Sequence, residues 1–262
     1  MKQIVKYKWE NWEPVFILDD GTKIRLFGQN VALRVGKKHC IGYYKNGKRF
    51  KCTEKTVYES VCEQCQKEDE YFMCIRCAGE CLNPKKRIQC INNTYAIYLA
   101  AFDSLIKIGI SVDFRLMERL VEQGADFGAR LVTVDDGKAV RKMEQKIKSE
   151  LEIVDKVSGD KKSEKIFGDP NKSVQELAKK INEIKGNGMP LLSPEIYDLR
   201  HYYRLQNVLS QPTRMEISEG TELEGTCIAA KGNIIIIKNS EWQMFNAHRM
   251  IGREVDSLQT NI

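Results

Sequence analysis

Long apolar segments are missing from this 262-residue chain. No run approaches the ~18–20 apolar residues that a membrane-spanning helix needs, and the first residues lack the apolar core of a secretory signal. We therefore expect a cytoplasmic protein with no membrane partner, whose thiols stay reduced. Low-complexity tracts and clear internal repeats are also absent, so the length predicts one large domain or two to three small ones.

Histidine is scarce and cysteine is unevenly spread. The three histidines, His39, His201 and His248, all lie outside residues 92–152, so that region lacks the commonest general base. Eight of the nine cysteines fall between positions 40 and 90. The ninth, Cys227, lies among apolar residues, and we expect it to be a buried thiol.

The clustered cysteines have the spacing of metal ligands. A C-x2-C pair places two thiolates on one turn, and two such pairs complete a tetrahedral zinc site. Eight ligands suffice for two structural Zn²⁺ ions, with His39 as an alternative ligand. Iron–sulfur clusters remain an alternative, as do disulfides in a hyperthermophile. We prefer sequential grouping to an interleaved one; the two groups are Cys40, Cys52, Cys62, Cys65 and Cys74, Cys77, Cys81, Cys90.

The charge balance is mildly basic, with 42 Lys and Arg against 36 Asp and Glu, and a net charge of +6. Such an excess permits nucleic-acid binding without requiring it. Lys85, Lys86 and Arg87 adjoin the last cysteine and are candidate phosphate contacts. The alternative is an ordinary solvated surface.

The periodicity predicts an α+β fold. Alternating patterns and turn signals mark β segments at 1–51 and 191–262, which we expect to pack together. They flank a cysteine module at 52–91, completed by Cys40, and an α+β domain with a helical extension at 92–190. A hairpin is predicted over residues 14–27, where Asp-Asp-Gly forms the turn.

The middle domain has its own order of elements. Strands are predicted at 94–102, 105–110 and 127–134, and helices at about 138–151 and 174–184. A further helix follows Asp113, which is placed to cap its N-terminus. Residues 155–172 are charged and interrupted by Gly and Pro, which indicates a loop or hinge.

This order of strands and helices resembles the GIY-YIG nuclease superfamily. The two signatures correspond to Ala96-Ile97-Tyr98 and Lys107-Ile108-Gly109. The family's arginine would be Arg115 or Arg119, and its metal-binding glutamate would be Glu144. A wider resemblance covers most of the chain, through Cys40-Ile-Gly-Tyr43, Phe72–Gly79 and Arg119–Ala125. On these segments the chain resembles a little-characterised family of cysteine-rich zinc proteins, a domain of unknown function that contains a GIY-YIG-like domain.

The resemblance implies phosphodiester chemistry. Glu144 would hold Mg²⁺ or Mn²⁺, Tyr98 would activate water, and an arginine would neutralise transition-state charge. Lys107 replaces the expected second tyrosine. A lysine is a poor base unless burial or neighbouring cations lower its pKa, but it is a good phosphate contact.

We therefore expect binding without cleavage, in which Lys107, Arg115 and Arg119 hold the phosphates. RNA is preferred to DNA, and transfer RNA, ribosomal RNA and the ribosome are the candidate partners. The alternatives are a metal-dependent endonuclease and a structural zinc scaffold for protein partners. In the scaffold, Tyr98 would be a core residue and Glu144 an exposed carboxylate. Convergence of Tyr98, Lys107, an arginine and Glu144 would disfavour the scaffold.

Overall fold

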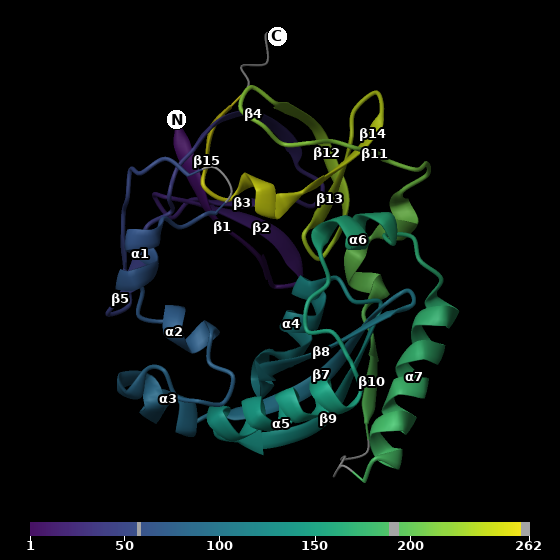
Figure 1. Ribbon diagram of the computed structural model, residues 1–262. Helices are drawn as coiled ribbons and strands as arrows, with labels where there is room; N and C mark the ends of the chain where they lie inside the picture. The colour runs from purple at the N-terminus through teal and green to yellow at the C-terminus, as the bar shows by residue number, and fades with distance from the viewer. Residues whose placement is uncertain (57–58, 189–193, 258–262) are drawn as a thin grey trace. The chain divides into compact units, whose positions relative to one another are not determined.

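The computed structural model describes residues 1–56, 59–188 and 194–257. The chain divides into two compact units (Figure 1). Unit 1 comprises Met1–Phe72 and Arg204–Ile262, and unit 2 comprises Met73–Tyr203. Helices and strands occur in both units, which confirms the α+β class. The unit boundary lies inside the predicted cysteine module, so four of the clustered cysteines belong to each unit.

Unit 1 contains a nine-stranded sheet with the order β11-β14-β13-β12-β4-β15-β1-β2-β3. The predicted hairpin is confirmed as β2 and β3, where Phe16 pairs with Ile24. Strand β15 pairs with both β1 and β4, so residues from the two β segments share one sheet. The strands are β1 (Lys2–Glu10), β2 (Glu13–Leu18), β3 (Lys23–Arg25), β4 (Asn30–Lys38), β11 (Thr213–Arg214), β12 (Glu222–Lys231), β13 (Ile234–Lys238), β14 (Trp242–Asn246) and β15 (Arg253–Ser257).

The core of unit 1 is stabilised by buried apolar side chains and by hydrogen bonds from the polar atoms of buried Tyr and Trp. Trp9 is almost fully buried, and its indole N–H donates to the carbonyl of Gly232 at 2.8 Å. The hydroxyl of Tyr7 donates to the same carbonyl at 2.6 Å. Buried Tyr and Trp need such partners, because an unpaired polar atom in a core is costly. The remaining elements are β5 (Tyr43–Lys45), β6 (Lys48–Phe50), α1 (Glu63–Glu68), η4 (Leu205–Asn207), η5 (Ala247–Met250) and α2 (Phe72–Ile75), which crosses the unit boundary.

Unit 2 is built on a four-stranded antiparallel sheet with the order β10-β9-β7-β8. Its strands are β7 (Thr94–Phe102), β8 (Leu105–Val112), β9 (Phe127–Asp135) and β10 (Glu195–Asp198). The three strands predicted for this domain are thus confirmed. The helices are η1 (Pro84–Lys86), α3 (Arg87–Ile91), η2 (Asp113–Arg115), α4 (Leu116–Gln123), α5 (Gly137–Glu150), α6 (Gly159–Glu164), α7 (Pro170–Gly186) and η3 (Arg200–Tyr203).

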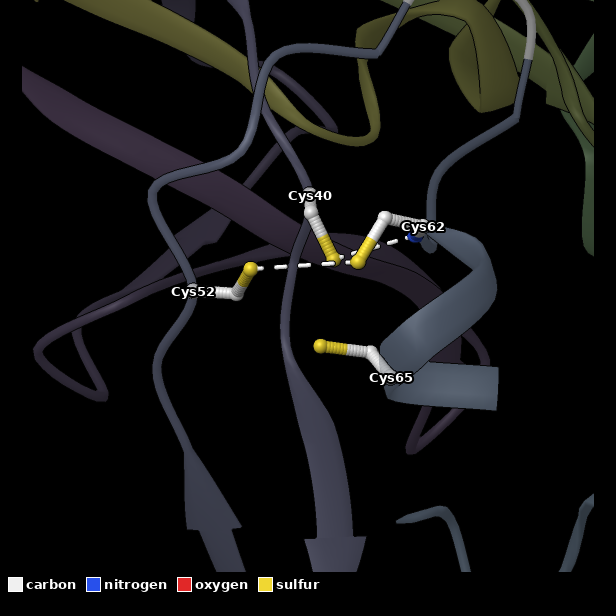
Figure 2. A group of neighbouring side chains, drawn as sticks. All are labelled: Cys40, Cys52, Cys62 and Cys65. Carbon is white, nitrogen blue, oxygen red and sulfur yellow. Dashed lines mark hydrogen bonds between the residues drawn. The ribbon is translucent and has the colours of Figure 1, made fainter. Parts of the chain in front are cut away.

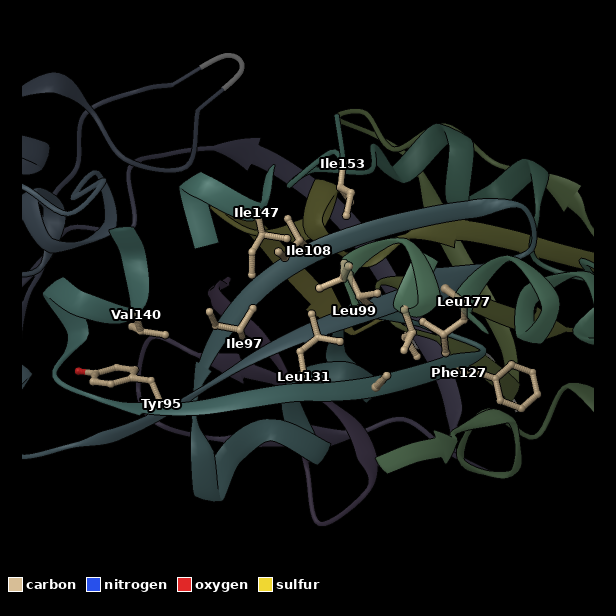
Figure 3. Packing of buried hydrophobic residues seen from close by; sticks show 14 residues of the cluster. Tyr95, Ile97, Leu99, Ile108, Phe127, Leu131, Val140, Ile147, Ile153 and Leu177 are labelled. Atoms are coloured by element: carbon tan, nitrogen blue, oxygen red, sulfur yellow. The ribbon is translucent and has the colours of Figure 1, made fainter. Parts of the chain in front are cut away.

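The two faces of this sheet carry different helices. Helices α5 and α7 pack on the face that presents Ile97, Leu99 and Leu131 (Figure 3). On the other face, Leu120 of α4 lies against Gly128, where an added Cβ would come within 2.5 Å of the leucine. Because side chains alternate along a strand, Tyr98 projects toward the α4 face.

Three local predictions need correction. Asp113 does not cap α4, because η2 intervenes and no side chain caps that helix; the carboxylate instead faces Arg130 at 3.5 Å. Residues 155–172 are not a simple loop, since they contain α6. Ser158 caps the N-terminus of this helix. Helix α7 starts earlier than predicted, because Asp169 caps it and Pro170 fits its first turn. Across the described residues, no helix is long and apolar enough to cross a membrane.

Candidate functional site

Four cysteines of unit 1 converge at one point. Cys40 follows β4, Cys52 follows β6, and Cys62 and Cys65 lie at the start of α1. Figure 2 shows their side chains directed toward one another, and the four sulfurs lie within 4.8 Å of each other. This is the first of the two groups predicted from sequential order, and it could hold a metal ion such as zinc.

The sulfur spacing suits one tetrahedral ion. The sulfurs of Cys52 and Cys62 are 3.9 Å apart, too far for a disulfide at about 2.05 Å. Around a single ion with Zn–S bonds of about 2.3 Å, tetrahedral sulfurs would be about 3.8 Å apart. An iron–sulfur cluster spreads its four thiolates further, because they are shared among two or four irons.

Backbone donors already support a thiolate at this site. The amide N–H groups of Gly42 and Cys62 donate to the Cys40 sulfur at 3.3 and 3.2 Å. Such bonds orient a metal ligand and stabilise its negative charge. Burial raises the pKa of Cys65, as it does that of Cys40, whereas the backbone N–H of Cys65 lowers the pKa of Cys62.

The second group of cysteines is arranged differently. Among the described residues, Cys74, Cys77, Cys81 and Cys90 do not gather at metal-ligand spacing. They do lie within electrostatic range of one another. Burial raises the pKa of Cys74, Arg141 opposes this rise, and the other three thiols add to it.

The second group is also anchored to the start of α5. Arg87 forms a two-pronged salt bridge with Asp136, which caps α5 by accepting the N–H of Lys138 at 2.8 Å. The sulfur of Cys90 lies so close to Gly137 that an added Cβ would be 2.4 Å from it. The segment carrying these thiols is therefore held against the helix that carries Glu144.

A second constellation lies on the α4 face of the unit 2 sheet. Tyr98 on β7 pairs across the ladder with Gly109 on β8, and an added Cβ at Gly109 would be 2.7 Å from the tyrosine hydroxyl oxygen. The glycine thus leaves the space that the ring occupies. Tyr98 is 1% exposed. Burial raises its pKa, and the neighbouring Arg119 guanidinium opposes that rise.

Lys107 lies on the same face, two residues from Gly109. The side chain is 7% exposed, and its Nζ donates to Gln123 Oε1 at 3.2 Å and to the Asp155 carbonyl at 2.9 Å. Burial, aided by the positive charge of Arg119, lowers the pKa of Lys107 to about 8.

Glu144 and Arg119 complete the constellation. Burial raises the pKa of Glu144, and the charge of Asp155 raises it further. The electrostatic influence of Glu144 reaches both Tyr98 and Lys107. The side chain of Arg119 is 45% exposed and pairs with Glu122 at 3.3 Å. The charges of Arg119 on α4 and Glu144 on α5 therefore both reach Tyr98 and Lys107, although α5 packs on the opposite face of the sheet from α4.

Comparison with known proteins places the chain in a family. Residues 28–255 match the family described as "Protein of unknown function (DUF2797)". The chain belongs to the DUF2797 family. Curated proteins and solved structures provide no match to it. The matched span contains all eight clustered cysteines and the four-residue constellation, so both sites lie in the DUF2797 region itself.

The remaining basic residues predicted to contact phosphate differ in exposure and in their partners in this DUF2797 protein. Arg115 lies four residues before Arg119 and binds Glu118 at 3.0 Å. Lys85 is exposed and Lys86 is half-buried, both on η1. Arg87 is engaged by Asp136 as described above.

The two residues that accept hydrogen bonds from Lys107 could not be recognised from the sequence. Gln123 and Asp155 hold the Lys107 amine, yet Gln123 reads as part of a helix end and Asp155 as part of a charged loop. The contact with Asp155 depends on the path of the chain after α5. That segment runs beside β8, where Val154 pairs with Lys107 in a parallel β-bridge. His39 is not in the cysteine cluster; its ring faces the Thr53 carbonyl and Glu254. Cys227 is fully buried, as predicted.

Proposed function

We propose that this protein binds nucleic acid, RNA in preference to DNA, at the α4 face of unit 2. The observation that carries the proposal is that Tyr98 and Lys107 are buried on this face and both feel the charges of Arg119 and Glu144. Buried titratable groups with shifted pKa values and opposite charges concentrate at functional sites. A purely structural scaffold has no need for a buried lysine and a buried glutamate, since burying charge is costly.

The phosphate contacts would come from the end of η2 and from α4. Arg115 and Arg119 both pair with Glu122, so their side chains lie side by side, and both are about half exposed. Their guanidinium groups match phosphate oxygens in a two-pronged way. Each pairs with exposed or partly exposed glutamates, and such pairs contribute at most about 1 kcal/mol, so a phosphate can displace them. Lys107 is too buried to take that role directly, and exposed Lys85 is a further candidate.

Zinc is the metal that best fits the cysteines. The donor set of four thiolates around one point is typical of structural Zn²⁺ sites. We extend the proposal to a second Zn²⁺ held by Cys74, Cys77, Cys81 and Cys90. Arg141 and Arg87 lie beside that group and would balance the negative charge of four thiolates.

Salt-dependent binding tests the main proposal. Arg115→Gln and Arg119→Gln together should weaken binding to a fluorescein-labelled RNA and reduce the slope of log K against log salt by about 2. Arg200→Gln is a matched control, because Arg200 is also a half-exposed unit 2 arginine in a carboxylate pair. Transfer RNA and ribosomal RNA, compared with DNA of equal length, test the preference. Absence of salt-sensitive binding to any of them would refute the proposal.

Hydrolysis of a phosphodiester at the same place is a second candidate function. The observation in its favour is the lowered pKa of Lys107, since burial and a neighbouring cation are the conditions that make lysine a usable base. Glu144 fits a divalent ion, because its carboxylate is buried and the nearby Asp155 charge repels its own. When bound there, such an ion would polarise a phosphoryl oxygen. Arg119 would hold the phosphate, and Tyr98 would orient the attacking water.

Cleavage assays separate the two functions. The purified protein is incubated with labelled RNA in Mg²⁺ or Mn²⁺. Loss of cleavage in Glu144→Gln, with binding retained, supports hydrolysis. Binding without cleavage under all these conditions would refute hydrolysis and support nucleic-acid binding.

A further inference from the structure

The partners of the Lys107 amine are unusual for a buried lysine. Both acceptors, Gln123 Oε1 and the Asp155 carbonyl, are neutral oxygens. Within the part of the chain that the structure describes, no carboxylate oxygen lies at salt-bridge distance from this amine. The nearby carboxylate of Asp155 pairs with Lys148 instead. A buried lysine is usually matched to a carboxylate, and here the match is missing.

Counting protons indicates which form of the amine this pocket accommodates. A neutral amine has two N–H donors and one lone pair, whereas an ammonium group has three donors and no acceptor. Two acceptors satisfy both N–H donors of the neutral form and leave its lone pair open. The ammonium form would leave its third proton without a described protein partner in a buried place, which costs free energy.

The surrounding charges act in opposite directions. Arg119 on α4 disfavours the ammonium form, while Glu144 on α5 and Asp155 in the following segment favour it. Burial is the largest influence, and the net result is a pKa of about 8. Tyr98 shares the sheet face and is itself kept protonated by burial. At pH 7 about a tenth of Lys107 is therefore the free amine, far more than for an exposed lysine that titrates near 10.4.

We propose that Lys107 is the proton acceptor for the water that attacks a phosphodiester at this site. The inference rests on the hydrolytic function proposed above. The lone pair of the neutral Nζ takes one proton from water while the water oxygen forms a bond to phosphorus. The P–O bond to the leaving oxygen breaks, and that oxygen keeps the electron pair and takes a proton from solvent. Lys107 then releases its proton to solvent.

The geometry brings phosphate and base into the same neighbourhood. Arg119 interacts with the Tyr98 hydroxyl and influences Lys107, and nearly half of its side chain reaches solvent. A phosphate bound by Arg119 would therefore lie near the amine. Lys107 would thus supply the base in place of the second tyrosine that the GIY-YIG resemblance implies.

The protonation state can be measured without any nucleic acid. In the metal-loaded full chain with ¹³C-labelled lysine, the Cε resonance of Lys107 is assigned by its disappearance in Lys107→Arg, and its shift is followed with pH. A midpoint near 8 supports the proposal, because exposed lysines titrate near 10.4. A midpoint at or above about 10 would overturn it.

Cleavage of labelled RNA in Mg²⁺ then tests the role. Lys107→Arg keeps a positive charge that cannot accept a proton, so cleavage should fall about 10²-fold or more while binding persists. Lys146→Met is the control, an exposed lysine on α5. Near-normal cleavage by Lys107→Arg would overturn the base role and leave hydrolysis intact. If the wild-type chain binds but never cleaves, hydrolysis fails and the base role fails with it, whatever the measured midpoint.

Discussion

Replacing Gly109 by alanine should destabilise unit 2 through a single steric conflict. The added Cβ would come within 2.7 Å of the Tyr98 hydroxyl oxygen and 2.8 Å of the ring carbon that bears it. Ordinary carbon contacts are about 3.5–4.0 Å, so the ring would have to shift by roughly 1 Å. Tyr98 is 1% exposed, so its ring would have to shift against the buried side chains around it. Overpacking of this kind costs about 1–3 kcal/mol, offset in part by about 0.4–1 kcal/mol from a less flexible unfolded chain.

The location of the chromophores allows the effect to be assigned to one unit. All three tryptophans, Trp9, Trp12 and Trp242, belong to unit 1, whereas the longest helices belong to unit 2. In urea unfolding, Gly109→Ala should shift the circular dichroism transition and leave the tryptophan fluorescence transition in place.

A matched glycine and a double mutant complete the experiment. Gly186→Ala, at the exposed end of α7 with nothing within 4 Å of the new Cβ, should be neutral or stabilising by up to about 1 kcal/mol. In a Tyr98→Ala background the penalty at Gly109 should disappear, because the clashing ring is gone. Equal effects of the two alanine substitutions in the wild-type background would refute the reasoning.

Three further predictions concern the metal sites, the lysine and the cap of α5. Cys52→Ser should remove one equivalent of zinc, measured by elemental analysis, whereas Cys227→Ala should keep full occupancy. For Lys107, the unfolded chain holds its proton up to about pH 10.5 while the folded chain loses it near 8, so stability rises between these values. The unfolding free energy of the wild type minus that of Lys107→Met should therefore rise by about 3 kcal/mol as the pH goes from 8 to 10.5. A difference that does not change with pH would contradict the lowered pKa. Asp136→Ala removes the cap of α5 and should cost about 0.5–2 kcal/mol by chemical denaturation, more than Asp135→Ala on the adjacent strand end.

Local patterns predicted much of unit 2 because its elements follow one another along the chain. The run from Thr94 to Phe102 is a continuous apolar β-like segment, and Asp103-Ser104 turns the chain directly into β8, which pairs with it. The first cysteine group was predictable for a similar reason, since C-x2-C and sequential order bring nearby ligands together.

Contacts over long sequence separations could not be predicted. The insertion of β15 between β4 and β1 depends on pairing between distant segments, which no local pattern encodes. The Asp155 carbonyl that accepts from Lys107 is a backbone atom, so side-chain identity says nothing about it. The unit boundary inside the cysteine module was also hidden, because regular cysteine spacing suggests one module where the fold makes two.

Strand β15 has a consequence for the order in which the protein can be assembled. Residues 253–257 fill the place between β1 and β4, two strands that were made more than two hundred residues earlier. Unit 2 is a continuous stretch, so it can fold on the ribosome while unit 1 still has a gap. Chains that stop before residue 253 would present two unpaired strand edges, which are templates for aggregation. The sheet of unit 1 can therefore be completed only after nearly the whole DUF2797 region has been translated.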